Sequence, residues 1–335
     1  MAEPTVSAGF ARGLMELAVA KGADRTALAR QSGIDLKDLE DQDNRVPFAT
    51  YVALMRAAKV ACNDPALALH FGESVNMADV SIVGLIGQAS ETVADAFMQL
   101  NRYVRLIVDV DMGTADRFQL KQERGGLWFV DTRKDPNDFL ELTESAFAQF
   151  VSGARRFDET FEVKALHFTY AEPSYRAAYE KIFRVSVVFD SDWNAMQFDP
   201  AWMTRRIAQL PRYVFGVLSE RAEELLKELE SSKTTRGQVE SLLMPVLHTG
   251  EVSMDAIAGK MALSRQTLLR KLKAEGTTFE KLLDELRHKM ALHYLSGKKT
   301  SVNETAYLVG FSESAAFSRA FKRWTGSSPR AVKRS

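Results

Sequence analysis

The sequence predicts an α+β N-terminal domain over residues 1–232, followed by an all-α C-terminal domain over residues 233–335 with two helix–turn–helix units joined by a long helix. Three observations support this organisation. The hydrophobic period changes along the first two-thirds of the chain, the formal charge divides unevenly, and a short pattern occurs twice near the C-terminus. A chain of 335 residues is also longer than one compact core usually supports.

Apolar residues recur at helical spacing from residue 5 onwards and predict a helical lobe over 1–109. The run 48–61 places four of them on one stripe, namely Tyr51, Leu54, Met55 and Ala58. The run 92–108 repeats the pattern, and Thr92 before it has a side chain suited to capping a helix N-terminus.

The period then shortens to two, which predicts an α+β lobe over 110–232. Alternating residues over 116–133, interrupted by Gly125-Gly126, are typical of a β-hairpin. The remaining expected elements are a helix over 137–157, a strand within 162–173, two short strands within 185–200 and a charged amphipathic helix over 215–232.

Formal charge separates the two predicted domains. The whole chain is neutral, with 44 Lys and Arg against 44 Asp and Glu. Residues 233–335 hold 18 basic against 9 acidic side chains and carry +9, whereas residues 1–232 hold 26 against 35 and carry −9. This asymmetry indicates an anionic partner at the basic end, although a solvated basic surface explains the charge alone equally well.

The basic domain contains an internal repeat, in which 258–273 resembles 306–322 after one inserted residue. The paired positions are Ala258 and Ala306, Ala262 and Gly310, Leu263-Ser264 and Phe311-Ser312, Leu268 and Phe317, Arg270 and Arg319, and Leu272-Lys273 and Phe321-Lys322. Each copy therefore has the residues of a helix–turn–helix. These are a small residue where the helices cross, a tight turn at Ala262 or Gly310, and an apolar residue, Leu263 or Phe311, that fills the core. Ser264 or Ser312 is expected to cap the second helix.

The second helix of each copy buries two apolar residues at i and i+4, so its opposite face is left free. That face presents Gln266, Leu269 and Arg270 in the first copy, and Ser314, Ala315, Ser318 and Arg319 in the second. A helix held down by apolar residues and polar on its outer face fits a major groove. The competing interpretation is a plain helical bundle with a basic surface.

Between the copies, 277–297 predicts a helix of about five turns with one apolar stripe, formed by Phe279, Leu282, Leu283, Leu286 and Met290. At about 1.5 Å per residue it spans roughly 25 to 30 Å, close to one turn of B-DNA at about 34 Å. A rigid connector of this length can place two helices over successive major grooves.

The two units and the run "GFSESAAFSRAFKRWTGSSPRAVKR" (310–334) resemble the DNA-binding domain of AraC-type transcriptional regulators over about residues 235–334. The resemblance implies that the seven residues on the free faces meet bases. We expect phosphate contacts from six others: Ser264, Arg265, Lys271, Lys273, Lys322 and Arg323.

The runs 83–106 and 183–199 resemble the arabinose-binding-type N-terminal domain of an AraC-type subgroup that includes ornithine-utilisation and virulence regulators. This resemblance implies that residues 1–232 bind a small-molecule effector and form a homodimer. It names neither the effector nor its binding residues. The expected function is a sequence-specific transcriptional regulator of promoter DNA, in contact with RNA polymerase if it activates.

An enzyme-like N-terminal domain fused to a DNA-binding domain is the alternative, and a purely architectural DNA binder would not need the acidic body. The five histidines are scattered, and no metalloprotease, nucleophile-elbow, Walker or dinucleotide motif occurs. We therefore expect no catalytic residue, metal or cofactor. Asp109 and Asp111 are expected at a solvated edge, and His167 in the core rather than at an effector.

The sequence also bears on location and redox state. No apolar run approaches the roughly 18 residues that span a bilayer, and the N-terminal residues lack the pattern of a signal peptide. A cytoplasmic protein without membrane partners is expected. Cys62 is the one cysteine, and a small buried apolar role is expected for it rather than a reactive thiol.

Overall fold

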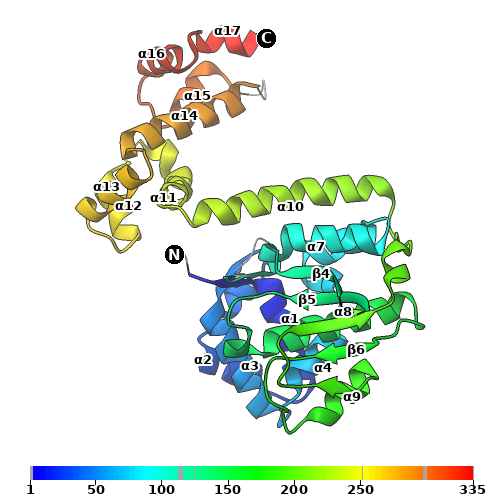
Figure 1. Ribbon diagram of the computed structural model, residues 1–335. Coiled ribbons are helices and arrows are strands. Elements are labelled where there is room, and N and C mark those ends of the chain that lie inside the picture. The colour runs from blue at the N-terminus through cyan, green and yellow to red at the C-terminus, as the bar shows by residue number, and fades with distance from the viewer. Residues whose placement is uncertain (1–2, 112–115, 124, 251, 297–299, 335) are drawn as a thin grey trace. The chain divides into compact units, whose positions relative to one another are not determined.

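The computed structural model, drawn as a ribbon in Figure 1, describes residues 3–111, 116–123, 125–250, 252–296 and 300–334. Arg124, inside the expected hairpin, and Gly297, at the end of the expected connecting helix, lie outside the described residues. Internal contacts divide the chain into one unit over Glu3–Leu226 and a second from Lys227 to the C-terminus. The division falls inside helix α10 (Arg212–Ser232), a few residues before the boundary expected from the sequence.

The first part of the N-terminal unit is mainly helical, as predicted. Its helices are α1 (Ala8–Ala20), α2 (Arg25–Ser32), η1 (Leu36–Leu39), α3 (Phe48–Ala61), α4 (Leu67–Ser74), α5 (Met77–Val80), α6 (Ile82–Ala89) and α7 (Val93–Ile107). The predicted stripe of α3 is buried. Thr92 caps α7: its hydroxyl accepts from the Asp95 N–H at 3.2 Å, and the Asp95 carboxylate accepts from the Thr92 N–H at 3.1 Å.

The helical part also contains a small antiparallel sheet that the sequence did not predict. Its strands β1 (Thr5–Ser7), β2 (Arg45–Pro47) and β3 (Val108–Asp109) lie in the order β2-β1-β3. Val6 pairs with Val46 on one side and with Val108 on the other. Strands of two or three residues are too short to show an alternating pattern, and their partners lie far apart in the chain.

The second part of the unit is built on a five-stranded sheet in the order β4-β5-β8-β6-β7. Its elements are β4 (Phe118–Glu123), β5 (Gly126–Asp131), η2 (Pro136–Phe139), α8 (Glu141–Phe157), β6 (Ala165–His167), α9 (Arg176–Phe183), β7 (Val187–Val188), β8 (Asn194–Phe198) and η3 (Pro200–Thr204). All neighbours are antiparallel except β6 and β7, which run parallel. The expected hairpin and the two strands within 185–200 are confirmed.

The strand expected within 162–173 is present as β6, which is much shorter and ends at His167. Two residues later, the Thr169 N–H donates to the side-chain oxygen of Asn194 at 3.0 Å. A side chain therefore takes the place of the neighbouring strand's backbone there. This contact joins residues 25 apart in the chain, so no local pattern signals it.

Aromatic rings fill the space between the sheet and α8. Phe129 of β5 stacks on Phe118 at 4.8 Å and on Phe150 at 4.8 Å, and meets Phe147 edge-on at 5.7 Å. Helix α7 lies along β4 (Figure 1). The Asn101 side chain of α7 donates to the Phe118 carbonyl at 2.7 Å and accepts from the Phe118 N–H at 3.1 Å. These contacts set the distance between α7, α8 and the sheet.

A buried carboxyl group links α8 to α9. Glu144 is fully buried, and its Oε1 accepts hydrogen bonds from the hydroxyls of Tyr175, at 2.9 Å, and Tyr179. Burial raises the pKa of Glu144 from 4.5 to about 7, against the opposing effect of the two tyrosine hydrogen bonds. The folded protein therefore holds this group protonated where an exposed glutamate ionises.

This burial predicts a stability that falls with rising pH. Between about pH 4.5 and 7 the unfolded chain releases the Glu144 proton and the folded chain keeps it, so unfolding releases a proton. A shift of this size corresponds to roughly 3 kcal/mol across the window. We expect Glu144→Gln, which stays neutral in both states, to flatten that part of a pH series of urea unfolding curves. Exposed Glu159→Gln is the matched control, and equal slopes for both variants and the parent would contradict the expectation.

The C-terminal unit is entirely helical in the residues that the structure describes. After the end of α10 it contains α11 (Thr235–Leu243), η4 (Met244–Thr249), α12 (Met254–Lys260), α13 (Arg265–Ala274), α14 (Phe279–Ser296), α15 (Val302–Leu308), α16 (Ser314–Thr325) and α17 (Pro329–Arg334). One apolar cluster joins these helices and includes Leu243, Leu268, Leu286, Phe317 and Phe321. The expected connecting helix is present as α14.

Candidate nucleic-acid interface and effector cavity

The first helix–turn–helix unit consists of α12 and α13. Leu268 and Leu272 of α13 are fully buried, and Ala258 of α12 is 2% exposed, as the repeat predicted. The turn places Ala262 at a φ of 52°, in the left-handed region. Ser264 caps α13, because its hydroxyl accepts from the Thr267 N–H at 3.2 Å. Local sequence thus accounts for the whole unit.

The second unit consists of α15 and α16. Phe317 and Phe321 are fully buried, and the turn residue Gly310 has a φ of 80°. The expected Ser312 cap is wrong: α16 begins at Ser314, its N-cap residue is Glu313, and no side chain of the described residues caps it. The single residue inserted in this copy moves the helix start by one position, which takes Ser312 out of reach of the free N–H groups.

The seven residues expected to face bases are unburied. Gln266, Leu269 and Arg270 are exposed on α13, Ala315 and Arg319 are exposed on α16, and Ser314 and Ser318 are half-buried there. Leu269 is 51% exposed, although it lies in a helix that buries its other leucines. Within the described residues, neither Arg270 nor Arg319 makes an ion pair, so both guanidinium groups are available to a ligand.

The six residues expected to contact phosphates are all exposed: Ser264, Arg265, Lys271, Lys273, Lys322 and Arg323. Two of them already have acidic partners. Arg265 lies 2.6 Å from Asp255, and Arg323 lies 2.6 Å from Asp284. Both pairs are solvent-exposed, so each contributes little stability and can exchange its carboxylate for a phosphate.

Arg287 of α14 supports the second unit and was not singled out from the sequence. Its guanidinium group donates to the Gly310 carbonyl at 3.3 Å and lies over the Phe311 ring at 4.9 Å from the ring centre. The two partners are more than 20 residues away along the chain. A helix-spacing pattern cannot reveal such a contact, because it relates only neighbouring turns of one helix.

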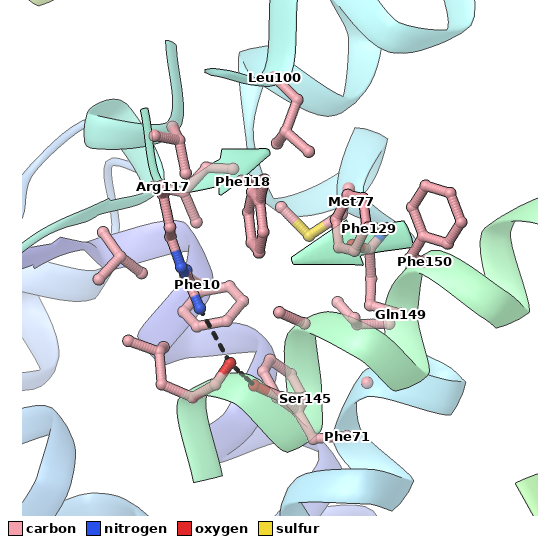
Figure 2. Close-up of a pocket in the computed structure, with 17 residues that line it drawn as sticks. Phe10, Phe71, Met77, Leu100, Arg117, Phe118, Phe129, Ser145, Gln149 and Phe150 are labelled. Atoms are coloured by element: carbon pink, nitrogen blue, oxygen red, sulfur yellow. Dashed lines mark hydrogen bonds between the residues drawn. The ribbon is translucent and has the colours of Figure 1, made fainter. Parts of the chain in front are cut away.

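A cavity lies inside the N-terminal unit, between the sheet and helices α1, α4, α7 and α8. Figure 2 shows Phe118 and Phe129 from the sheet on one side and Phe10, Phe71 and Ser145 from the helices on the other. Its volume is about 50 Å³. The remaining wall is mainly aliphatic and includes Val75, Met77, Leu100, Val104, Ile107, Val108 and Leu142. The sequence indicated an effector domain but none of these positions.

Arg117, the one cation among the described residues of the cavity wall, is already neutralised. Arg117 is 4% exposed, and its guanidinium group donates to the Asp131 carboxylate at 3.1 Å and to the Leu142 carbonyl at 3.2 Å. Burial alone would raise the pKa of Asp131, but the charge and hydrogen bonds of Arg117 hold it below its ordinary value. Thr143 also donates to Asp131 at 2.9 Å. The pair is therefore a structural element beside the cavity.

Other positions considered from the sequence lie outside this cavity. His167 is half-buried, with its Nδ1 3.0 Å from the Ser191 hydroxyl and its ring edge-on to Trp128. The expectation of a solvated edge is wrong for Asp109. Its side chain is 5% exposed and paired with Arg105 at 3.2 Å, because β3 pairs with β1. Asp111 is exposed. Cys62 is half-buried, and burial raises the pKa of its thiol.

The two regions match known protein families in the same order. Residues 22–207 match the arabinose-binding N-terminal domain of AraC transcription regulators, and residues 257–335 match a helix-turn-helix domain. The chain belongs to the AraC family of transcription regulators. It is a DNA-binding regulator with an arabinose-binding-type N-terminal ligand domain, which agrees with control by a small molecule.

Two known regulators resemble the chain in sequence over nearly its full length. The ornithine utilization regulator of Pseudomonas aeruginosa is 25% identical over 333 residues, which cover 97% of this chain and 95% of that protein. The regulator VirS of Mycobacterium tuberculosis is 24% identical over 320 residues, covering 92% and 90%. The crystal structure of CdpR from Pseudomonas aeruginosa superposes with a TM-score of 0.40 and 21% identity, over 84% of this chain and 91% of that one.

Within the described ranges, no three His, Cys, Asp or Glu side chains lie together as metal ligands would. None of the helices in the described part of the chain is long and apolar enough to cross a bilayer. The relatives that match it over most of their length are transcription regulators.

Proposed function

We propose that this AraC-family chain reads promoter DNA with α13 and α16, and that a small molecule bound in its N-terminal domain controls the reading. The observation that carries the proposal is the doubled helix–turn–helix, each copy of which buries one helix face and leaves the other open. In this proposal Gln266, Leu269 and Arg270, with Ser314, Ala315, Ser318 and Arg319, meet bases, while the six basic and hydroxyl residues around them meet phosphates.

The chemistry of the open faces supports these roles. Arg270 and Arg319 each present a planar guanidinium group, which can meet guanine O6 and N7 with two hydrogen bonds. Leu269 presents a bare apolar side chain, which can contact a thymine methyl group. The lysines on the flanks of both helices carry charge without directional preference, as phosphate contacts require.

The proposal extends to the rest of the molecule. Residues 1–232 form the effector-binding and dimerisation domain, with a helical lobe over 1–109 and an α+β lobe over 110–232, and residues 233–335 form the DNA-binding domain. The chain is not an enzyme, acts in the cytoplasm where promoter DNA lies, and contacts RNA polymerase if it activates. A metabolite that stabilises the full chain without being converted would support a sensor over an enzyme-like domain.

Arg270→Ala is expected to weaken DNA binding by about 1–3 kcal/mol and to relax base preference within one half of the site. Lys322→Ala should instead weaken binding to all sequences alike, because a phosphate contact carries no base information. Binding profiles of the full chain over a randomised operator measure both effects. A uniform loss for Arg270→Ala would rule out its base-reading role.

The spacing of the site is expected to follow from α14, whose 18 residues span about 27 Å. Two contacted segments should therefore lie about 10 base pairs apart, one helical turn, on the same face of the duplex. Inserting about 5 base pairs between them puts them on opposite faces, and affinity should fall to that of one unit. The same insertion placed outside the site is the control. Footprints that stay equally strong over both segments would show a flexible connector instead.

A further inference from the structure

The wall of the N-terminal cavity is almost entirely hydrocarbon. Five phenylalanine side chains line it, together with a methionine and several branched aliphatic residues. Its volume of about 50 Å³ is below the roughly 150 Å³ of an apolar cavity that binds benzene. An occupant must therefore displace side chains, and the partly exposed Met77, Leu100, Gln149 and Phe150 are the wall residues with room to move.

The wall offers few polar groups to an occupant. The Ser145 hydroxyl donates to the Leu142 carbonyl at 3.3 Å, and the Arg117 guanidinium group is paired with Asp131. Within the described residues the Gln149 amide makes no hydrogen bond. Gln149 is thus the wall residue best able to supply a directed polar contact, and it can both donate and accept.

These features count against three classes of effector on physical grounds. An ammonium group would find no carboxylate among the described residues of the wall, and burying it unpaired is costly. A carboxylate would have to share Arg117 with the Asp131 carboxylate, which already accepts from Arg117 and Thr143. A sugar would bring several hydroxyl groups to a wall with about one free partner, and each buried hydroxyl without a hydrogen bond costs about 1–3 kcal/mol.

We propose that the effector of this chain is a compact, uncharged and mainly apolar molecule with one hydrogen-bonding group, held among the phenylalanine rings with that group on Gln149. The inference rests on the proposed function, in which a small molecule controls DNA binding. It sets this chain apart from the arabinose in the name of its N-terminal domain family and from the ornithine in the name of its relative.

Thermal unfolding of the full chain with four probes tests the proposal: indole, benzoate, L-ornithine and L-arabinose. Indole is neutral and aromatic with one N–H, and it should raise Tm by about 3 to 6 °C at ten times its Kd. The other three should leave Tm unchanged at equal concentrations. A rise with ornithine, arabinose or benzoate but none with indole would overturn the proposal.

Two variants locate the binding. Ala146→Phe fills the cavity from α8 and should abolish the shift with indole, whereas Ala177→Phe, the same change at an exposed site on α9, should keep it. Gln149→Leu removes the polar contact, and should weaken indole about tenfold while leaving toluene unchanged. A shift with indole that survives both Ala146→Phe and Gln149→Leu would place the ligand elsewhere and refute the site.

DNA retardation of the same samples separates this inference from the proposed function. If indole binds at the cavity but leaves operator affinity unchanged, control of DNA binding by this site fails and the ligand chemistry stands. If operator affinity responds to ornithine or arabinose and not to indole, effector control stands and the ligand chemistry fails.

Discussion

Gly310→Ala is expected to destabilise the C-terminal unit by about 3 kcal/mol. Gly310 has a φ of 80°, and a Cβ added to it would lie 2.2 Å from the Leu247 carbonyl oxygen. The left-handed conformation costs an alanine about 1 kcal/mol. The close approach adds to this, because the obstacle is backbone and cannot rotate away, and forced backbone shifts cost about 1–3 kcal/mol.

Gly326→Ala is the matched control for this change. Gly326 has a φ of 75°, and no atom in the described part of the chain lies within 4 Å of a Cβ added to it. It should therefore lose only the conformational part, about 1 kcal/mol. Urea unfolding of the full chain, followed by a probe in the C-terminal unit, measures both. Equal losses for the two variants would show that the contact with Leu247 does not constrain the turn.

The repeat makes this prediction sharper. The corresponding turn residue of the first unit is Ala262, which already adopts a φ of 52° and is exposed. An alanine is thus tolerated at this exposed turn and should be rejected where the Leu247 carbonyl approaches. In footprints, Gly310→Ala should lose protection over the segment read by α16 before that read by α13.

Asp131→Ala is expected to cost the N-terminal unit about 3–5 kcal/mol, because it leaves the Arg117 charge buried without a partner. Both side chains are 4% exposed or less. Asp131 also accepts from Thr143 and from the Arg133 N–H at 3.2 Å, so the substitution breaks several contacts at once. Thermal or urea unfolding of the full chain measures the loss.

The exposed pair of Arg206 and Glu91 provides the comparison. Its side chains are 79% and 60% exposed, although their atoms approach to 2.8 Å. Arg206→Ala should therefore cost only about 0–1 kcal/mol. A loss for Asp131→Ala no larger than that for Arg206→Ala would mean that water reaches Arg117 through the cavity and solvates it.

Much of the DNA-binding unit could be predicted, because its signals are local. The spacing of Leu268 and Leu272, and of Phe317 and Phe321, defines a buried helix face within one or two turns, and the structure buries all four. The Thr92 and Ser264 caps depend on contacts within three residues. The expectation that Ser312 caps α16 was wrong. One residue inserted in the second copy moves the start of α16 by one position, so Glu313 is its N-cap residue.

The sequence by itself determined the order of the two regions, the hairpin and the doubled helix–turn–helix, because periodicity, capping and repetition act between residues close in the chain. Only the tertiary structure decided the β2-β1-β3 sheet, the burial of Asp109, the approach of Leu247 to Gly310 and the walls of the cavity. The cavity joins side chains from Phe10 to Phe150, whose spacing carries no periodic signal. The polarity of the cavity wall depends on which side chains the tertiary packing brings together.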